Sequence, residues 1–304
     1  MASVESKDLY DLYKSWAQKM AANPNMQLDE LRRLFSHWGD VTADPRGVDY
    51  IEVEAAGLPA MWVLPKGCVK DRALLCSHGG GYVVGSIYTH RKLFGHIAKA
   101  VGCRALIVDY RLAPESPHPG PVNDMASTYR WLLEHEGLKP EHIAFTGDSA
   151  GGALALTTIA AVRQQGLPLP AATMPMSPWV GADTSGETYV TNMERDALVS
   201  RNTTDGLGSL FIGEKGNPYD PLANPLYIDY TGYPPIYLQV GDAEVLLDDS
   251  RRIASKAKNE GVDVRLDIFP DMQHVFEFLA GVAPEADDAI ARMAAWVRPK
   301  LGMR

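Results

Sequence analysis

The stretch Gly147-Asp148-Ser149-Ala150-Gly151 lies between the apolar run His142–Thr146 and the helical run Ala153–Val162. The spacing Gly-x-Ser-x-Gly is typical of a nucleophile elbow, where a strand turns sharply into a helix and strains the backbone of the serine. Such a turn exposes the Ser149 hydroxyl and puts the N–H of Ala150 at a helix N-terminus, which stabilises an oxyanion. The pentapeptide therefore predicts a strand-turn-helix unit that either carries a serine nucleophile or is a plain tight turn.

A second glycine-rich turn, His78-Gly79-Gly80-Gly81, follows a short apolar strand further upstream. Acyl transfer needs backbone N–H donors aimed at a developing oxyanion, and a loop without Cβ atoms brings its amides close to the substrate. A phosphate cradle is the competing interpretation, but the glycine spacings of nucleotide-binding loops are missing. The two motifs in this order indicate a serine hydrolase. The predicted oxyanion-hole donors are the N–H groups of Gly80, Gly81 and Ala150.

A serine nucleophile needs a base and an acid later in the chain, in the order Ser, Asp/Glu, His. His274 follows the apolar run Val262–Phe269 and is the candidate base, against the plainer interpretation of a packing histidine. Of the remaining histidines, His78 belongs to the glycine-rich turn, and the others, His90 among them, fall outside the motifs. The candidate acids follow the strand Ile236–Val240 and are Asp242, Glu244 and Asp248.

Four motifs in family order resemble the hormone-sensitive-lipase-like branch of the α/β-hydrolases over about Ala73 to Phe276. They are His78–Gly81, Asp109–Glu115, Gly147–Gly152 and Pro270–Phe276. The resemblance implies that His274 is the base. It also implies that Glu244 is the acid, since Glu244-Val245-Leu246 aligns with the family's Asp-Pro-Leu, with Asp242 as the alternative and Asp248 as an ordinary helix carboxylate. The shorter stretches Glu244–Ser250 and His274–Phe276 resemble bacterial esterases that include monoterpene lactone hydrolases.

Strands and helices alternate along most of the chain. The predicted strands are Val48–Glu54, Leu58–Leu64, Ala73–Ser77, Arg104–Asp109, His142–Thr146, Ala171–Met176, Ile236–Val240 and Val262–Phe269. The predicted helices are Thr89–Val101, Val122–Glu134, Ala150–Gln164, Val245–Glu260 and Pro284–Val297. Nearly continuous apolar strands favour a mostly parallel sheet with helices on both faces. We expect an α/β-hydrolase fold with eight strands, a helical cap, and its site at the carboxyl ends of the strands.

Two segments, residues 1–45 and about 181–233, are predicted to lie outside this core and to form the cap. Residues 1–45 hold two amphipathic helices, which in the resembling family form part of a cap. Residues 46–304 form the catalytic domain, with a cap insertion at about 181–233 that contains predicted helices over Met193–Asn202 and Thr204–Phe211. The hypothetical substrate contacts, for which ordinary packing is the competing interpretation, are Tyr82, Trp179, Tyr189 and Leu207.

Three charged motif residues are interpreted as scaffold. Arg111 and Glu115 are predicted to pair with each other and fix the loop after their strand. Asp148 is predicted to accept hydrogen bonds within the tight turn before Ser149.

Composition limits the remaining function classes. The chain has 304 residues, of which 46% are hydrophobic, enough for one large α/β core. A net charge of −9 argues against nucleic acids and anionic membrane surfaces. Three cysteines without metal or disulfide spacing, and an N-terminus interrupted by charges, predict a cytoplasmic protein. No apolar run is long enough for a membrane span, and no histidine or cysteine pattern predicts a metal or other cofactor.

The sequence thus predicts a cofactor-free carboxylic ester hydrolase with the triad Ser149, His274 and Glu244, acting on short to medium acyl esters. Lactones are the close alternative, because ring opening uses the same chemistry. A small-molecule receptor, as in the gibberellin receptors of this branch, is a further alternative, which the presence of both Ser149 and His274 argues against. The resemblance also implies a homodimer.

Overall fold

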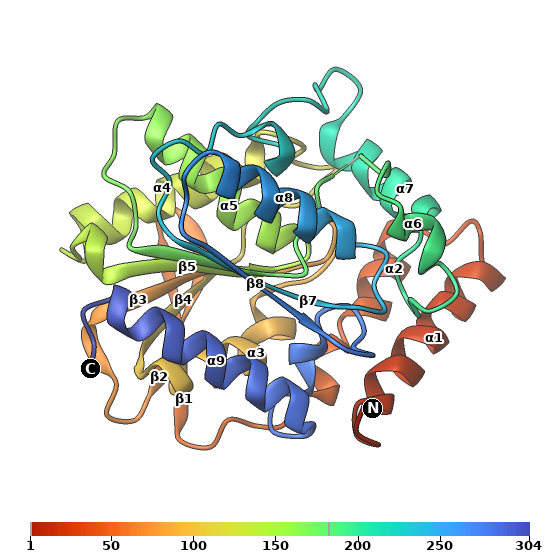
Figure 1. Ribbon diagram of the computed structural model, residues 1–304, viewed down its shortest axis with the longest axis horizontal. Coiled ribbons are helices and arrows are strands. Elements are labelled where there is room, and N and C mark those ends of the chain that lie inside the picture. Colours follow the sequence, from red (N-terminus) through yellow and green to blue (C-terminus); the bar gives the residue numbers. More distant parts are fainter. Residues whose placement is uncertain (1, 182) are drawn as a thin grey trace.

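An eight-stranded sheet with the strand order β1-β2-β4-β3-β5-β6-β7-β8 forms the centre of the computed structural model, which describes residues 2–181 and 183–304 (Figure 1). The predicted segments 1–45 and 181–233 are therefore described without Met1 and Ala182. The strands are β1 (Val48–Ala55), β2 (Leu58–Pro65), β3 (Val69–Ser77), β4 (Cys103–Val108), β5 (Ile143–Asp148), β6 (Ala172–Met176), β7 (Ile236–Gly241) and β8 (Val264–Phe269). Strand β2 runs antiparallel to β1 and β4, and the other neighbours are parallel. The predicted α/β-hydrolase fold with eight mostly parallel strands is confirmed.

Helices cover both faces of the sheet (Figure 1). One face carries α3 (Ile87–Val101) and α9 (Pro284–Lys300), and the other carries α4 (Gly120–Glu134), α5 (Ala150–Gln164) and α8 (Leu247–Asn259). Alternate residues of β3 explain the two layers, because successive strand side chains point to opposite faces. Leu74 and Cys76 belong to one apolar cluster, whereas Ala73 and Leu75 belong to the other.

The parallel strands end at one edge of the sheet. Ser77 pairs with Gly147 at the ends of β3 and β5, and Gly241 pairs with Phe269 at the ends of β7 and β8. The segments that follow these strands hold the two glycine motifs and the candidate acid and base. The register therefore brings residues far apart in the sequence to the same edge.

Four further helices lie on this side of the molecule (Figure 1). They are α1 (Lys7–Ala22) and α2 (Leu28–Phe35) from the N-terminal segment, and α6 (Thr188–Thr191) and α7 (Arg201–Ile212) from the segment between β6 and β7. Short 3₁₀ turns complete the chain: η1 (Trp38–Val41), η2 (Pro140–His142), η3 (Pro225–Tyr227) and η4 (Phe276–Leu279). None of the helices in the described ranges is long and apolar enough to cross a membrane.

The predicted helix Met193–Asn202 is wrong, because residues 193–200 form a turn, a bend and irregular chain, and only the last two residues of the predicted range begin α7. Polar side chains explain the difference, since they offer the backbone partners other than a helix. The Asp196 carboxylate accepts the N–H groups of Leu198 and Val199 at 3.0 and 2.8 Å. The amide of Asn192 donates to the carbonyl oxygen of Glu244 at 2.7 Å.

The predicted pair between Arg111 and Glu115 is also wrong. The Arg111 guanidinium binds Asp124 of α4 at 2.6 Å, while Glu115 binds Arg32 of α2 at 2.7 Å. The chain turns between the two residues, so each side chain meets a different helix. The pairing partners came from segments that local sequence spacing does not bring together.

Candidate active site

Ser149 lies at the junction of β5 and α5 in a strained backbone conformation. Its φ is 53° and its ψ is −122°, which a residue with a Cβ rarely adopts. The turn is tight because strand and helix pass close to β3, and a Cβ on either Gly147 or Gly151 would overlap the carbonyl oxygen of Ser77. The strand-turn-helix unit thus holds the serine hydroxyl at the carboxyl edge of the sheet.

His274 lies in the loop between β8 and η4 and is almost fully buried. Its Nδ1 is 2.8 Å from Oε2 of Glu244. With Glu244 ionised, this Nδ1 must carry the hydrogen, which leaves Nε2 free to accept a proton. The backbone is fixed as well, because the hydroxyl of Tyr13 in α1 donates to the carbonyl oxygen of His274 at 2.9 Å.

Glu244 is fully buried, and both of its oxygens are engaged. While Oε2 faces His274, Oε1 accepts hydrogen bonds from the Ser177 hydroxyl at 2.7 Å and from the N–H of Gly241 at 2.6 Å. These bonds hold the carboxylate in the orientation that His274 requires.

The other two candidate acids lie elsewhere. Asp242 pairs with Arg195 at 2.8 Å on the surface, and Asp248 accepts the N–H of Thr188 at 3.1 Å. Of the three carboxylates considered from the sequence, Glu244 is the one that the structure brings to His274.

The charges around His274 favour its protonated form. Burial alone lowers the pKa of the imidazole, but the bond to Glu244 and the negative charges of Glu244 and Asp196 outweigh burial, so the pKa is raised. Asp196 is itself buried, and burial raises its pKa to about 6. The negative charges of Glu244 and Asp196 therefore stabilise the imidazolium that His274 forms when it takes up a proton.

The glycine loop after β3 turns beside the elbow. Gly80 has a φ of +112° and Gly81 a φ of +60°, and a Cβ on Gly80 would overlap the carbonyl oxygen of Val84. Among the described residues, no acceptor is found for the N–H groups of Gly80 and Gly81. Two free donors at a cavity wall match what an oxyanion needs.

Asp148 and His90 join this loop to the elbow. The Asp148 carboxylate accepts the N–H of Gly79 at 3.1 Å, and Nε2 of the buried His90 lies 3.2 Å from its other oxygen. Asp148 thus accepts hydrogen bonds as expected, but across two motifs rather than within one turn. Nothing in the sequence distinguished His90 from an ordinary helix residue.

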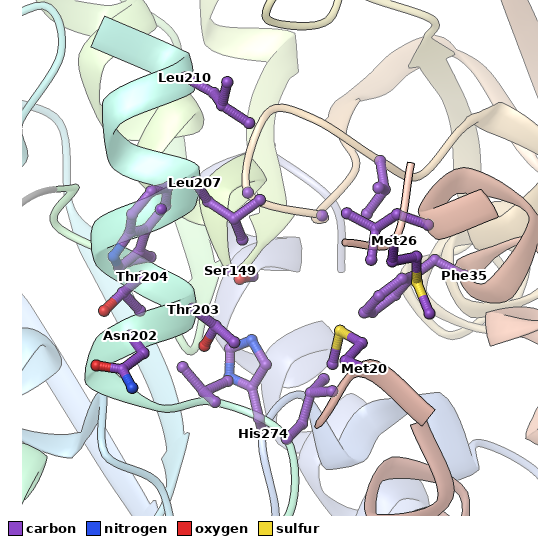
Figure 2. A pocket seen from close by; sticks show the side chains of 18 of the residues that line it. Met20, Met26, Phe35, Ser149, Asn202, Thr203, Thr204, Leu207, Leu210 and His274 are labelled. Carbon is purple, nitrogen blue, oxygen red and sulfur yellow. The ribbon is translucent and has the colours of Figure 1, made fainter. Parts of the chain in front are cut away.

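A cavity of about 530 Å³ opens above these groups. Ser149 and His274 lie between two walls in Figure 2, one from the N-terminal segment and one from α7 with the residues just before it. The N-terminal wall consists of Met20, Pro24, Met26, Leu31, Phe35 and Trp38. The opposite wall consists of Leu198, Val199, Asn202, Thr203, Thr204, Gly206, Leu207 and Leu210. Among the described residues, no Asp, Glu, Lys or Arg lines this cavity.

The hypothetical substrate contacts divide into two pairs. Trp179 and Leu207 line the cavity. Tyr82 lies outside its lining and stacks on Phe211, with ring centroids 3.7 Å apart. Tyr189 also lies outside the lining, and its hydroxyl donates to the buried Asp249 at 3.4 Å. Within residues 2–181 and 183–304, no cluster of three or more His, Cys, Asp or Glu side chains is arranged to hold a metal ion.

Comparison with known proteins yields close relatives. A family described as having the alpha/beta hydrolase fold matches residues 74–278. An acetyl-hydrolase from Streptomyces hygroscopicus is 35% identical over 297 residues, covering 92% of this chain and 98% of its own length. The crystal structure of an esterase from the bacterial hormone-sensitive lipase family is 41% identical with a TM-score of 0.94, covering 99% of this chain and 100% of that one. The esterase EstE5, soaked with p-nitrophenyl butyrate, is 36% identical with a TM-score of 0.90 and the same coverage.

Proposed function

This chain belongs to the hormone-sensitive-lipase-like branch of the α/β-hydrolase fold family and is a carboxylic ester hydrolase, and we propose that it cleaves short to medium uncharged acyl esters through Ser149, His274 and Glu244. The single observation that carries the proposal is the bond of 2.8 Å between His274 Nδ1 and Glu244, at a cavity that Ser149 also lines. That bond leaves the other imidazole nitrogen available as a base in the cavity that the strained Ser149 also lines.

The reaction proceeds by a covalent intermediate. Ser149 Oγ attacks the ester carbonyl while His274 takes the hydroxyl proton, and Glu244 stabilises the imidazolium. The carbonyl oxygen becomes an oxyanion, which the N–H groups of Gly80, Gly81 and Ala150 bind. His274 then returns the proton to the leaving alcohol. Water activated by the same imidazole releases the acid from Ser149.

The cavity supports an uncharged substrate. A carboxylate or ammonium group in the ester would lose its water against mostly apolar walls that contain no Asp, Glu, Lys or Arg as a counter-charge, which is costly. The volume of about 530 Å³ lies in the range of ordinary small-molecule sites. The relative named acetyl-hydrolase and the p-nitrophenyl butyrate soak of EstE5 favour short acyl groups.

The test is hydrolysis of p-nitrophenyl butyrate by the wild type and by Ser149→Ala, with circular dichroism to verify that both are folded. We expect steady turnover by the wild type and a loss of roughly 10⁴-fold or more in the variant. p-Nitrophenyl hexanoate and mono-p-nitrophenyl adipate form a matched neutral and charged pair, and kcat/KM for the adipate should be lower by at least roughly 100-fold because its carboxylate is desolvated. A folded wild type without turnover, or a variant as active as the wild type, contradicts the proposal. A simple lactone in the same assay decides whether cyclic esters are also accepted.

A further inference from the structure

Arg32 of α2 reaches from the N-terminal segment to the loop that carries Gly80 and Gly81. Its Nε donates to the carbonyl oxygen of Val83 at 3.0 Å, and its Nη2 donates to the carbonyl oxygen of Ala113 at 3.2 Å. The same guanidinium binds both oxygens of Glu115 at 2.7 Å. One side chain thus joins three points that lie on two different loops.

The two carbonyl groups belong to segments that determine where Gly80 and Gly81 lie. The N–H groups of Val83 and Val84 both donate to the carbonyl oxygen of Gly80 at 3.0 Å, which closes the turn directly after the two glycines. The N–H of Ala113 donates to the carbonyl oxygen of Tyr82 at 2.8 Å. Movement of either carbonyl that Arg32 binds would therefore move the turn that contains Gly80.

Two other hydrogen bonds hold the start of this loop. Gly79 is bound to Asp148, and the Tyr110 hydroxyl donates to the carbonyl oxygen of His78 at 2.7 Å. These bonds precede Gly80 in the chain. After Gly81, the carbonyl groups of Tyr82 and Val83 are bound by Ala113 and Arg32, and the ring of Tyr82 also stacks on Phe211.

We propose that Arg32 is a positioning residue for the reaction, which holds the N–H groups of Gly80 and Gly81 at the place where the oxyanion forms. This inference rests on the proposed function. A guanidinium suits the task because its planar fork donates in several fixed directions at once. Arg32 is absent from the cavity lining, so it acts through the loop and does not contact the substrate.

Loss of Arg32 should lower kcat more than it raises KM, because the oxyanion exists only in the transition state and the acyl-transfer intermediates. A misplacement of N–H donors by a fraction of an ångström to one ångström corresponds to a kcat lower by on the order of 10-fold to 100-fold. The affinity for an alkylboronic acid, which forms a tetrahedral adduct with the serine, should weaken by a comparable factor. A purely structural role would lower thermal stability without this pattern.

The experiment compares Arg32→Ala with Arg33→Ala on p-nitrophenyl butyrate and on inhibition by butylboronic acid. Arg33 is the matched control because it follows directly in α2 and pairs with Asp29 on the exposed surface. Glu115→Gln removes the ion pair with Arg32 but leaves its hydrogen bonds to the carbonyl groups of Val83 and Ala113 possible. This variant therefore separates the effect of the ion pair from the effect of the loop contacts. We expect Arg32→Ala to lose kcat and boronate affinity together with KM within about threefold, and both other variants to keep most of the activity.

Three results would overturn the inference. They are an unchanged kcat in folded Arg32→Ala, a raised KM with unchanged kcat, and an equal loss in Arg33→Ala. Thermal denaturation verifies that each variant is folded under assay conditions. The proposed function fails separately, by an inactive wild type or an active Ser149→Ala, so the two failures are distinguishable.

Discussion

Replacing Glu244 with glutamine keeps the shape of the buried acid and should reverse the position of the proton on His274. Oε1 of Glu244 accepts a hydrogen bond from the N–H of Gly241 at 2.6 Å, and a backbone N–H can only donate. The amide oxygen of the introduced glutamine must therefore take this position, which turns the NH₂ group toward His274. Since NH₂ donates, Nδ1 of His274 must accept, and the imidazole hydrogen moves to Nε2.

A His274 that carries its hydrogen on Nε2 cannot take the proton from Ser149. We therefore expect kcat of Glu244→Gln on p-nitrophenyl butyrate to fall by about 10⁴-fold, which corresponds to about 5 kcal/mol of transition-state stabilisation. The Ser177 hydroxyl can rotate to suit either group, so the fold should survive. Stopped assays at high enzyme concentration measure the residual kcat, and chemical denaturation measures whether the variant keeps its folding stability.

Asp242→Asn is the matched control for this prediction. It makes the same change of carboxylate to amide two residues away, at a partly exposed side chain that pairs with Arg195. We expect it to retain most of the activity. A loss below about tenfold in Glu244→Gln, or an equal loss in Asp242→Asn, would refute the assignment of Glu244 as the acid.

Three further predictions concern groups near His274. Asp196→Asn removes a negative charge that raises the pKa of His274, so the pKa of His274 should fall. Because His274 acts as a base only when it is neutral, at a pH above its pKa, the acid limb of kcat/KM should move to lower pH. A pH–rate profile measures this shift. Ser177→Ala leaves one oxygen of Glu244 with a single donor and should lower kcat by about tenfold, measured with p-nitrophenyl butyrate and contradicted by wild-type kinetics. Tyr13→Phe removes the hydrogen bond to the carbonyl oxygen of His274 and should lower the free energy of unfolding by about 1–3 kcal/mol, which urea denaturation measures.

The sheet was predictable because its signals are local. The central strands are short apolar runs, β1 alternates apolar and charged residues, and the elbow requires glycines at fixed offsets from Ser149. All eight predicted strands are present, with ends that differ by a few residues. The failure at Met193–Asn202 has a physical reason, because Asn192 and Asp196 bind backbone groups of distant segments. No local pattern contains those partners.

The site was predictable only in part for the same reason. The sequence offered three carboxylates for His274, and the choice between them depends on how the loop after β7 turns. Ser177 and His90 gave no signal, since a serine after a strand and a histidine in a helix are common. Their roles arise from contacts across 67 and 58 positions of the chain, with Glu244 and Asp148 respectively.

The N-terminal helices have a consequence for engineering. Met20 and Phe35 line the cavity, whereas Tyr13 and Arg32 on the same two helices bind the backbones of His274 and Val83. Exchanging this segment for that of a relative, in order to change substrate preference, would also exchange the supports of the machinery beneath it. A chimaera should therefore carry Tyr13 and Arg32 across unchanged. A library that randomises the whole segment would select mainly for restored turnover, and variation confined to the cavity-facing positions would report on substrate choice alone.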